Sequence, residues 1–139
     1  MFGKIASIYL DSKTERPIPL LINTLSYSTI VVLFYNLNYP TIFLLYAIIL
    51  TAITLLTFLS SYFVKISLHT AGWGTFTGII IAYSFITKID LSLLISIILI
   101  LSAITMTIRL YLNKHNAFQV YTAWIGALLI SMFFLLSFK

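Results

Sequence analysis

The chain of 139 residues contains no cysteine, only three acidic residues, and just 8% charged residues in total. Without cysteine, disulfide bonds, thiolate catalysis and cysteine-ligated metal centres are excluded. Soluble domains carry about a quarter charged residues, whereas 61% of this chain is hydrophobic and its mean hydropathy is +1.10. This composition predicts an integral membrane protein.

Apolar runs separated by short polar segments dominate the sequence. The runs cover about Ile18 to Tyr35, Pro40 to Val64, Thr70 to Ile86, Leu91 to Leu112, and Ala117 to Phe138. Each is near the roughly 17 to 25 residues that a helix needs to cross a bilayer, and long unalternating runs do not suit a β-barrel. We therefore expect an all-α fold, an integral membrane helical bundle of about five transmembrane helices that forms one domain over residues 1–139.

Small and hydroxyl residues within these runs are expected to serve helix packing. The third run contains Gly72, Gly74 and Gly78, and the last two form a Gly-x-x-x-Gly pair, which permits close contact between helices. Hydroxyl side chains of the fourth run are expected to bond to backbone carbonyls or neighbouring helices. They include Ser96, Ser102, Thr105 and Thr107.

Alternating crossings would bring three polar segments to one membrane face. These are residues 4–16, 65–69 and 109–115, which together contain both histidines and both arginines of the chain. Six of the eight basic residues fall on this face, a bias typical of the cytoplasmic side. Lys13, Arg16 and Arg109 are also candidates for anion binding, however, and without them the bias no longer decides the orientation.

The groups expected on this face suit an oxyanion such as phosphate. Guanidinium groups donate paired hydrogen bonds to phosphate oxygens. Of two histidines, one can attack phosphorus through a neutral ring nitrogen while the other protonates the leaving group.

Metal and nucleic-acid sites are not expected. A catalytic zinc ion normally takes three protein ligands, whereas this face offers two histidines and the carboxylates of Asp11 and Glu15, both confined to the amino-terminal segment. We therefore expect neither a metal nor another cofactor. The basic residues are scattered rather than arranged in a stripe, so nucleic acid is not an expected partner.

Three segments together resemble the signatures of the type 2 phosphatidic acid phosphatase superfamily of lipid phosphate phosphatases. They are Lys13-Thr-Glu-Arg16-Pro17, Ile66-Ser67-Leu68-His69 and Arg109-Leu-Tyr-Leu-Asn-Lys-His115. The family pattern is a lysine, six residues and Arg-Pro, then Pro-Ser-Gly-His, then Ser-Arg, five residues and a histidine with an aspartate four positions later. The third segment is the most specific match, and this chain is similar to a short, partly divergent member.

The resemblance implies a role for each matched residue. His115 would be the nucleophile that forms a phosphohistidine, and His69 would be the general acid. Phosphate-binding groups would be Arg16, Arg109 and Ser67, with Lys13 and Lys65 as additional cations. The implied activity is metal-independent hydrolysis of a membrane lipid phosphate or polyprenyl diphosphate.

The sequence departs from the family pattern at several positions. Lys13 precedes Arg16 by three positions rather than seven, and the residues flanking Ser67 are isoleucine and leucine. Gln119 stands where the family has the aspartate that orients the nucleophile. Its side chain can still accept a hydrogen bond from the His115 ring, but it brings no negative charge.

Two other functions stay open on the sequence. The chain could be a catalytically inactive phosphatase-like subunit of a larger membrane complex, with other membrane subunits as partners. Small-solute transport ranks lower, because no crossing carries a charged residue near its midpoint. For the enzyme, the expected partners are membrane lipids and a phosphorylated amphiphilic substrate, and the expected location is a bacterial inner membrane, which the chain would cross several times.

Overall fold

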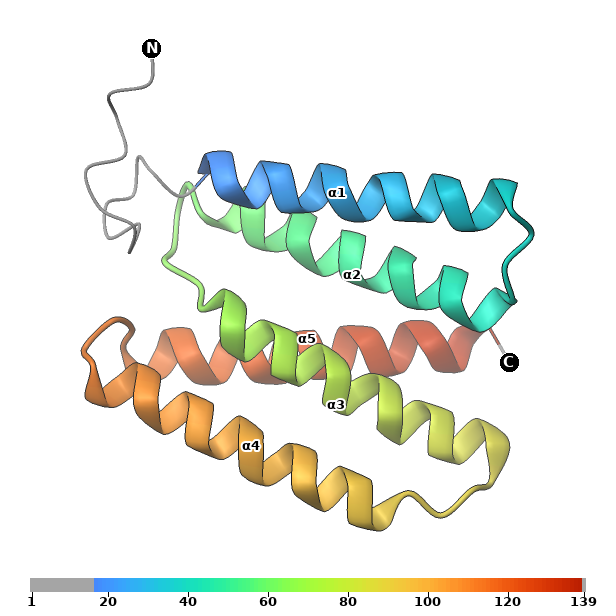
Figure 1. Cartoon of the computed structure of the whole chain (residues 1–139). Helices are drawn as coiled ribbons and strands as arrows, with labels where there is room; N and C mark the ends of the chain where they lie inside the picture. Colours follow the sequence, from blue (N-terminus) through green and yellow to red (C-terminus); the bar gives the residue numbers. More distant parts are fainter. Residues whose placement is uncertain (1–16, 139) are drawn as a thin grey trace. The chain divides into compact units, whose positions relative to one another are not determined.

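The computed structural model describes residues 17–138, which form five α-helices and no strand. The helices are α1 (Pro17–Asn36), α2 (Thr41–Ser60), α3 (Leu68–Thr87), α4 (Ser92–Tyr111) and α5 (Ala117–Ser137), as Figure 1 shows. Each has 20 or 21 residues. At about 1.5 Å per residue this length matches the roughly 30 Å hydrocarbon core of a bilayer. The prediction of an all-helical fold is confirmed.

Among the described helices, α1, α2, α4 and α5 are long and apolar enough to cross a membrane. The remaining helix, α3, has glycines, threonines and His69 in its first half, which lower its hydropathy. Large apolar side chains are exposed along the helices, with Leu93 77% and Phe133 74% exposed. Such broad apolar exposure is what contact with lipid tails requires, so the structure is consistent with a membrane protein.

The end of α2 differs from the prediction. The second run was expected to continue to Val64, but the helix ends at Ser60. The Ser61 hydroxyl donates to the Phe58 carbonyl at 2.6 Å, and the Val64 N–H returns to the Ser60 carbonyl at 2.8 Å. The Ser61 hydroxyl thus satisfies a carbonyl of the last helical turn, as serine side chains do near helix ends.

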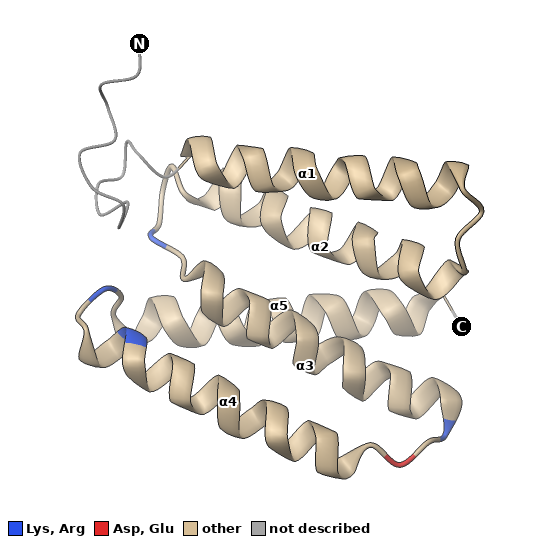
Figure 2. Cartoon of the chain, viewed as in Figure 1, with Lys and Arg blue, Asp and Glu red and all other residues tan. Residues whose placement is uncertain are grey.

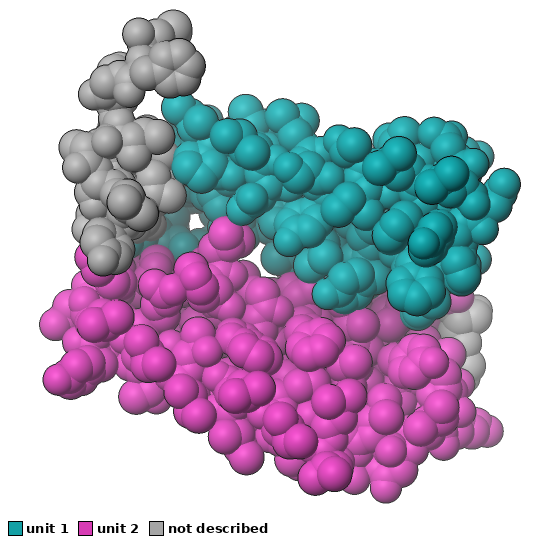
Figure 3. Space-filling model, viewed as in Figure 1, with its two compact units in different colours: residues 1–66 teal, residues 67–139 magenta. Residues whose placement is uncertain are grey.

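The described chain divides into two compact units, residues 17–66 and 67–138 (Figure 3). In the first unit α1 packs against α2, with Leu20 and Thr24 of α1 and Ile49 of α2 buried. The expectation of a single domain concerns how the two units join, and it stays a prediction.

In the second unit α3 and α5 form the closest helix pair, and α4 packs against α3. A methyl group at Gly74 would overlap the backbone carbonyl of Trp124, and one at Gly78 would overlap the Leu128 carbonyl and the Ser131 hydroxyl. A methyl group at Gly72 would meet no atom within 4 Å. The predicted packing role of the Gly74 and Gly78 pair is confirmed, and its contact is the backbone of α5.

Short connections fix the direction of the three helices of the second unit. Lys88 (φ 56°) ends α3 in the left-handed region, and the Asp90 carboxylate accepts from the Ser92 N–H at 2.9 Å to begin α4. Asn113 (φ 51°) turns the chain after α4, a conformation that asparagine tolerates better than most residues. As a result, the start of α3, the end of α4 and the start of α5 lie at one end of this unit (Figure 1).

The hydroxyl residues of α4 behave in two ways. Ser96 donates to the Ser92 carbonyl at 2.9 Å and Thr107 to the Ala103 carbonyl at 2.8 Å, as expected. Ser102 is wrongly predicted, because its hydroxyl is buried and makes no hydrogen bond within the described chain. Ser102 lies on the buried face of α4, one turn after Ile98.

Candidate functional site

One end of the second unit collects several of the residues that the sequence singles out. Ser67 immediately precedes α3, His69 lies in its first turn, and Arg109 lies in the last turn of α4. His115 lies in the loop before α5, and Gln119 in the first turn of α5. Figure 2 shows basic residues around the α4–α5 connection at this end of the unit, whereas the α3–α4 connection, which contains Lys88 and Asp90, lies at the other end.

His69 and Arg109 are close enough to interact electrostatically. Two effects lower the pKa of the His69 imidazole, first the loss of hydration among its neighbours and second the positive charge of Arg109. His69 is nevertheless an exposed residue, so solvent still reaches it. The structure thus places the solvent-accessible imidazole of His69, whose neutral form is favoured, near the guanidinium of Arg109. An anion could bind between the two groups.

His115 contacts Gln119 one helical turn further along the chain. Its Nδ1 lies 3.3 Å from the Gln119 Oε1. The amide therefore occupies the place beside the ring that the resemblance assigns to an aspartate, and supplies an acceptor without a charge.

The start of α5 contains a residue that the sequence analysis missed. Asn116 is the N-cap of α5, and its side chain forms a capping box with Gln119. The Asn116 Oδ1 accepts from the Gln119 N–H at 2.9 Å, while the Gln119 Oε1 accepts from the Asn116 N–H at 3.3 Å. The signal was present in the sequence, since a cap residue followed three positions later by Gln or Glu before an apolar run is a helix-start signature.

Ser67 is fully buried, and its hydroxyl makes no hydrogen bond within the described chain. It is also the N-cap of α3, but its side chain does not cap the helix. A buried hydroxyl without a partner costs about 1 to 3 kcal/mol of stability. A hydrogen bond from the Ser67 hydroxyl to a bound anion would offset this cost. Its burial means that a bound anion reaches it only after local opening.

The other expected site residues are not brought together by the described structure. Lys65 belongs to the first unit, so its part in phosphate binding stays a prediction. Lys13 and Arg16 lie outside the described residues 17–138. Within that range no three histidine, aspartate or glutamate side chains gather in a group that could hold a metal ion.

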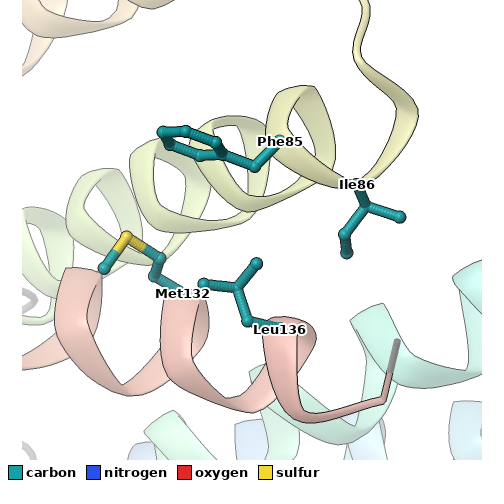
Figure 4. A pocket seen from close by; sticks show the side chains of 4 residues that line it. All are labelled: Phe85, Ile86, Met132 and Leu136. Atoms are coloured by element: carbon teal, nitrogen blue, oxygen red, sulfur yellow. The ribbon is translucent and has the colours of Figure 1, made fainter.

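An apolar hollow lies between α3 and α5 at the end of the second unit opposite the histidines. It has a volume of about 360 Å³ and is lined by Phe85 and Ile86 of α3 and Met132 and Leu136 of α5 (Figure 4). None of these side chains titrates or carries a nucleophile, so the hollow has no chemistry of its own.

No protein-family model, no curated protein and no solved structure matches this chain.

Proposed function

We propose that this chain is a multi-pass integral membrane phosphatase that hydrolyses a lipid phosphate or polyprenyl diphosphate through a phosphohistidine, without a metal ion. The observation that carries the proposal is that the start of α3, the end of α4 and the loop before α5 lie at one end of the three-helix unit (Figure 1). These segments contain His69, Arg109 and His115, and the charge of Arg109 acts on His69. Two histidines and a guanidinium are the minimum set that binds a phosphoryl group, attacks it and protonates what leaves.

The proposed reaction has two steps. A neutral ring nitrogen of His115 attacks phosphorus, the bond from phosphorus to the lipid oxygen breaks, and His69 gives its proton to that oxygen. Water then attacks the phosphohistidine, the P–N bond breaks, and His69 takes the proton from the water as phosphate is released. Arg109 binds the phosphoryl oxygens in both steps, where a charge-assisted hydrogen bond is stronger than a neutral one.

The low pKa of His69 fits this cycle only with substrate bound. In the empty site burial and, to a smaller extent, the charge of Arg109 lower the pKa of His69 and favour the neutral ring, whereas a general acid must carry a proton. A phosphate dianion next to Arg109 offsets the guanidinium charge and raises the pKa of His69 again. Binding of substrate would therefore favour protonation of His69, which donates this proton in the first step.

A membrane location supplies the substrate. Four helices of bilayer-spanning length with exposed apolar side chains would hold the basic end of the second unit at the level of lipid headgroups. The fifth crossing would be the predicted run from Thr70 to Ile86 within α3, which begins after His69. The lipid tail stays in the bilayer while its phosphate reaches this end. We propose a bacterial inner membrane as the location and other membrane lipids as the surrounding partners.

The test is phosphate release by the purified chain in detergent from phosphatidic acid, phosphatidylglycerol phosphate, a polyprenyl diphosphate and a lipid A phosphate. His115→Asn should reduce release by at least about 10³-fold, as loss of a nucleophile does in other covalent hydrolases. Vanadate, which mimics pentavalent phosphorus, should inhibit, and release should persist with a chelator. Lys88→Gln, at the opposite end of the unit, is the matched control and should be silent.

Release that survives His115→Asn, ignores vanadate or requires a divalent ion contradicts the proposal. Release from none of the four substrates, with the chain folded, favours the inactive subunit of a larger complex.

A further inference from the structure

We propose that Asn116 is a positioning residue that sets the tautomer of His115 through Gln119, with the ring proton held on Nδ1 and the lone pair presented on Nε2. The juxtaposition that carries this inference is the sharing of one oxygen, the Gln119 Oε1, between the Asn116 N–H and the His115 Nδ1. The consequence for catalysis rests on the proposed function, but the consequence for the tautomer does not.

The first step fixes which way the Gln119 side chain points. A side-chain amide presents an oxygen and a nitrogen of nearly equal shape, and only its hydrogen-bond partners tell them apart. The backbone N–H of Asn116 can only donate, so the Gln119 atom that lies 3.3 Å from it must be the oxygen. The nitrogen end is excluded, because it would place two donors against each other.

The second step fixes the Asn116 side chain in the same way. The backbone N–H of Gln119 donates to the Asn116 Oδ1 at 2.9 Å. This bond holds the first turn of α5 closed and keeps the two residues facing each other. In the capping box, therefore, the backbone N–H of each residue bonds to the side-chain oxygen of the other and fixes how that side chain is oriented.

The third step passes this selection to the imidazole. The same Gln119 Oε1 lies 3.3 Å from the Nδ1 of His115. An amide oxygen has lone pairs and no proton, so the contact is a hydrogen bond only if Nδ1 carries the hydrogen. In the neutral ring the lone pair then resides on Nε2, the nitrogen on the far side of the ring from Gln119.

This arrangement explains how a neutral residue can stand in for a carboxylate. An aspartate would select the Nδ1–H tautomer by charge, whereas Gln119 does so by orientation, and Asn116 provides the orientation. What is lost is the charge that would stabilise an imidazolium. What is kept is the choice of nitrogen, which decides whether the nucleophile faces the substrate.

The test reads the tautomer directly. The chain in detergent micelles, labelled with ¹⁵N-histidine, gives separate signals for protonated and bare ring nitrogens. Because the chain has only two histidines, a His69→Gln background leaves His115 alone in the spectrum. In this background we expect a protonated Nδ1 and a bare Nε2 at a pH where the ring is neutral. A protonated Nε2 with a bare Nδ1 overturns the inference.

Variants then test the role of Asn116. N116A keeps the backbone N–H that bonds to the Gln119 Oε1 but removes the side-chain cap that holds the first turn of α5 closed. It should therefore convert His115 to a mixture of tautomers, and N116S, whose hydroxyl also caps helices, should restore the single form. Q119M removes the acceptor but keeps a helix-forming side chain of similar length, and should give the same mixture even if N116A disturbs folding. An unchanged tautomer in folded N116A contradicts the positioning role of Asn116, and an unchanged tautomer in Q119M contradicts the role of Gln119 through which it acts.

Kinetics in the otherwise native chain separate this inference from the proposed function. N116A should lower kcat for phosphate release by about 10- to 100-fold, the range seen when metal-binding histidines lose the partners that orient them, with little change in KM and recovery in N116S. If the tautomer depends on Asn116 but the native chain releases no phosphate, the positioning role stands and the phosphatase proposal fails. If the native chain releases phosphate and N116A changes neither tautomer nor kcat, the positioning role fails alone.

Discussion

Gly74 of α3 lies against the backbone carbonyl of Trp124 in α5 so closely that no side chain fits between them. The contact is with main-chain atoms, which cannot rotate away as the end of a flexible side chain would. Together with Gly78, it makes the α3–α5 pair the centre of the unit that holds the candidate site.

The first prediction concerns this contact. Gly74→Ala should destabilise the chain by about 1 to 3 kcal/mol, the usual range for overpacking a close contact, because α3 and α5 must move apart to admit the methyl group. Gly72→Ala is the matched control, since a methyl group there meets nothing within 4 Å. Thermal unfolding in detergent measures both, and equal midpoints for the two variants would contradict the packing role.

The second prediction concerns the charge beside His69. Arg109→Gln should raise the pKa of His69, because it removes the positive charge that opposes protonation, but the pKa should stay below its ordinary value because the larger cause, desolvation, persists. Addition of vanadate to the native chain should raise it as well. Titration of the His69 ring signals by NMR measures these shifts, with Lys88→Gln as the silent control. If the pKa of His69 is the same in Arg109→Gln as in the native chain, the two residues do not interact.

The sign of the same shift predicts a pH dependence of stability. A lowered pKa means that folded His69 binds a proton less readily than it does in the unfolded chain. The contribution of neutral His69 to the free energy of unfolding is therefore fully present above the ordinary histidine pKa. It is lost as the pH falls through the lowered pKa of the folded chain. Arg109→Gln should weaken this acid-side loss of stability, which unfolding at several pH values would reveal.

The third set of variants compares two buried hydroxyls that have no partner within the described chain, Ser67 and Ser102. Removing either should leave stability unchanged or raise it by up to about 1 to 3 kcal/mol, the usual cost of an unsatisfied buried polar group. Only Ser67, at the histidine end, should matter for anions. Ser67→Ala should weaken vanadate binding, whereas Ser102→Ala, in the middle of α4, should not. Equal vanadate affinity in both variants would remove Ser67 from the site.

Sequence patterns predicted much of the local structure here. Apolar runs of bilayer length predicted the helices, the Gly74 and Gly78 spacing predicted a close helix contact, and short polar segments predicted the turns. The end of α2 was missed because the Ser61 hydroxyl bonds to the Phe58 carbonyl at the end of the helix, a contact that an apolar run does not reveal. Asn116 was missed because a polar patch between two runs was interpreted only as a loop.

The amino-acid sequence by itself determined that the chain is helical and apolar enough for a membrane, because hydropathy and run length are properties of neighbouring residues. It also supplied the types of group, imidazole and guanidinium, that the proposed chemistry needs. Only the tertiary structure decided that the charge of Arg109 acts on His69 and that the glycines of α3 pack against the backbone of α5. These relationships depend on helix packing and loop geometry across many residues, and no local pattern specifies them.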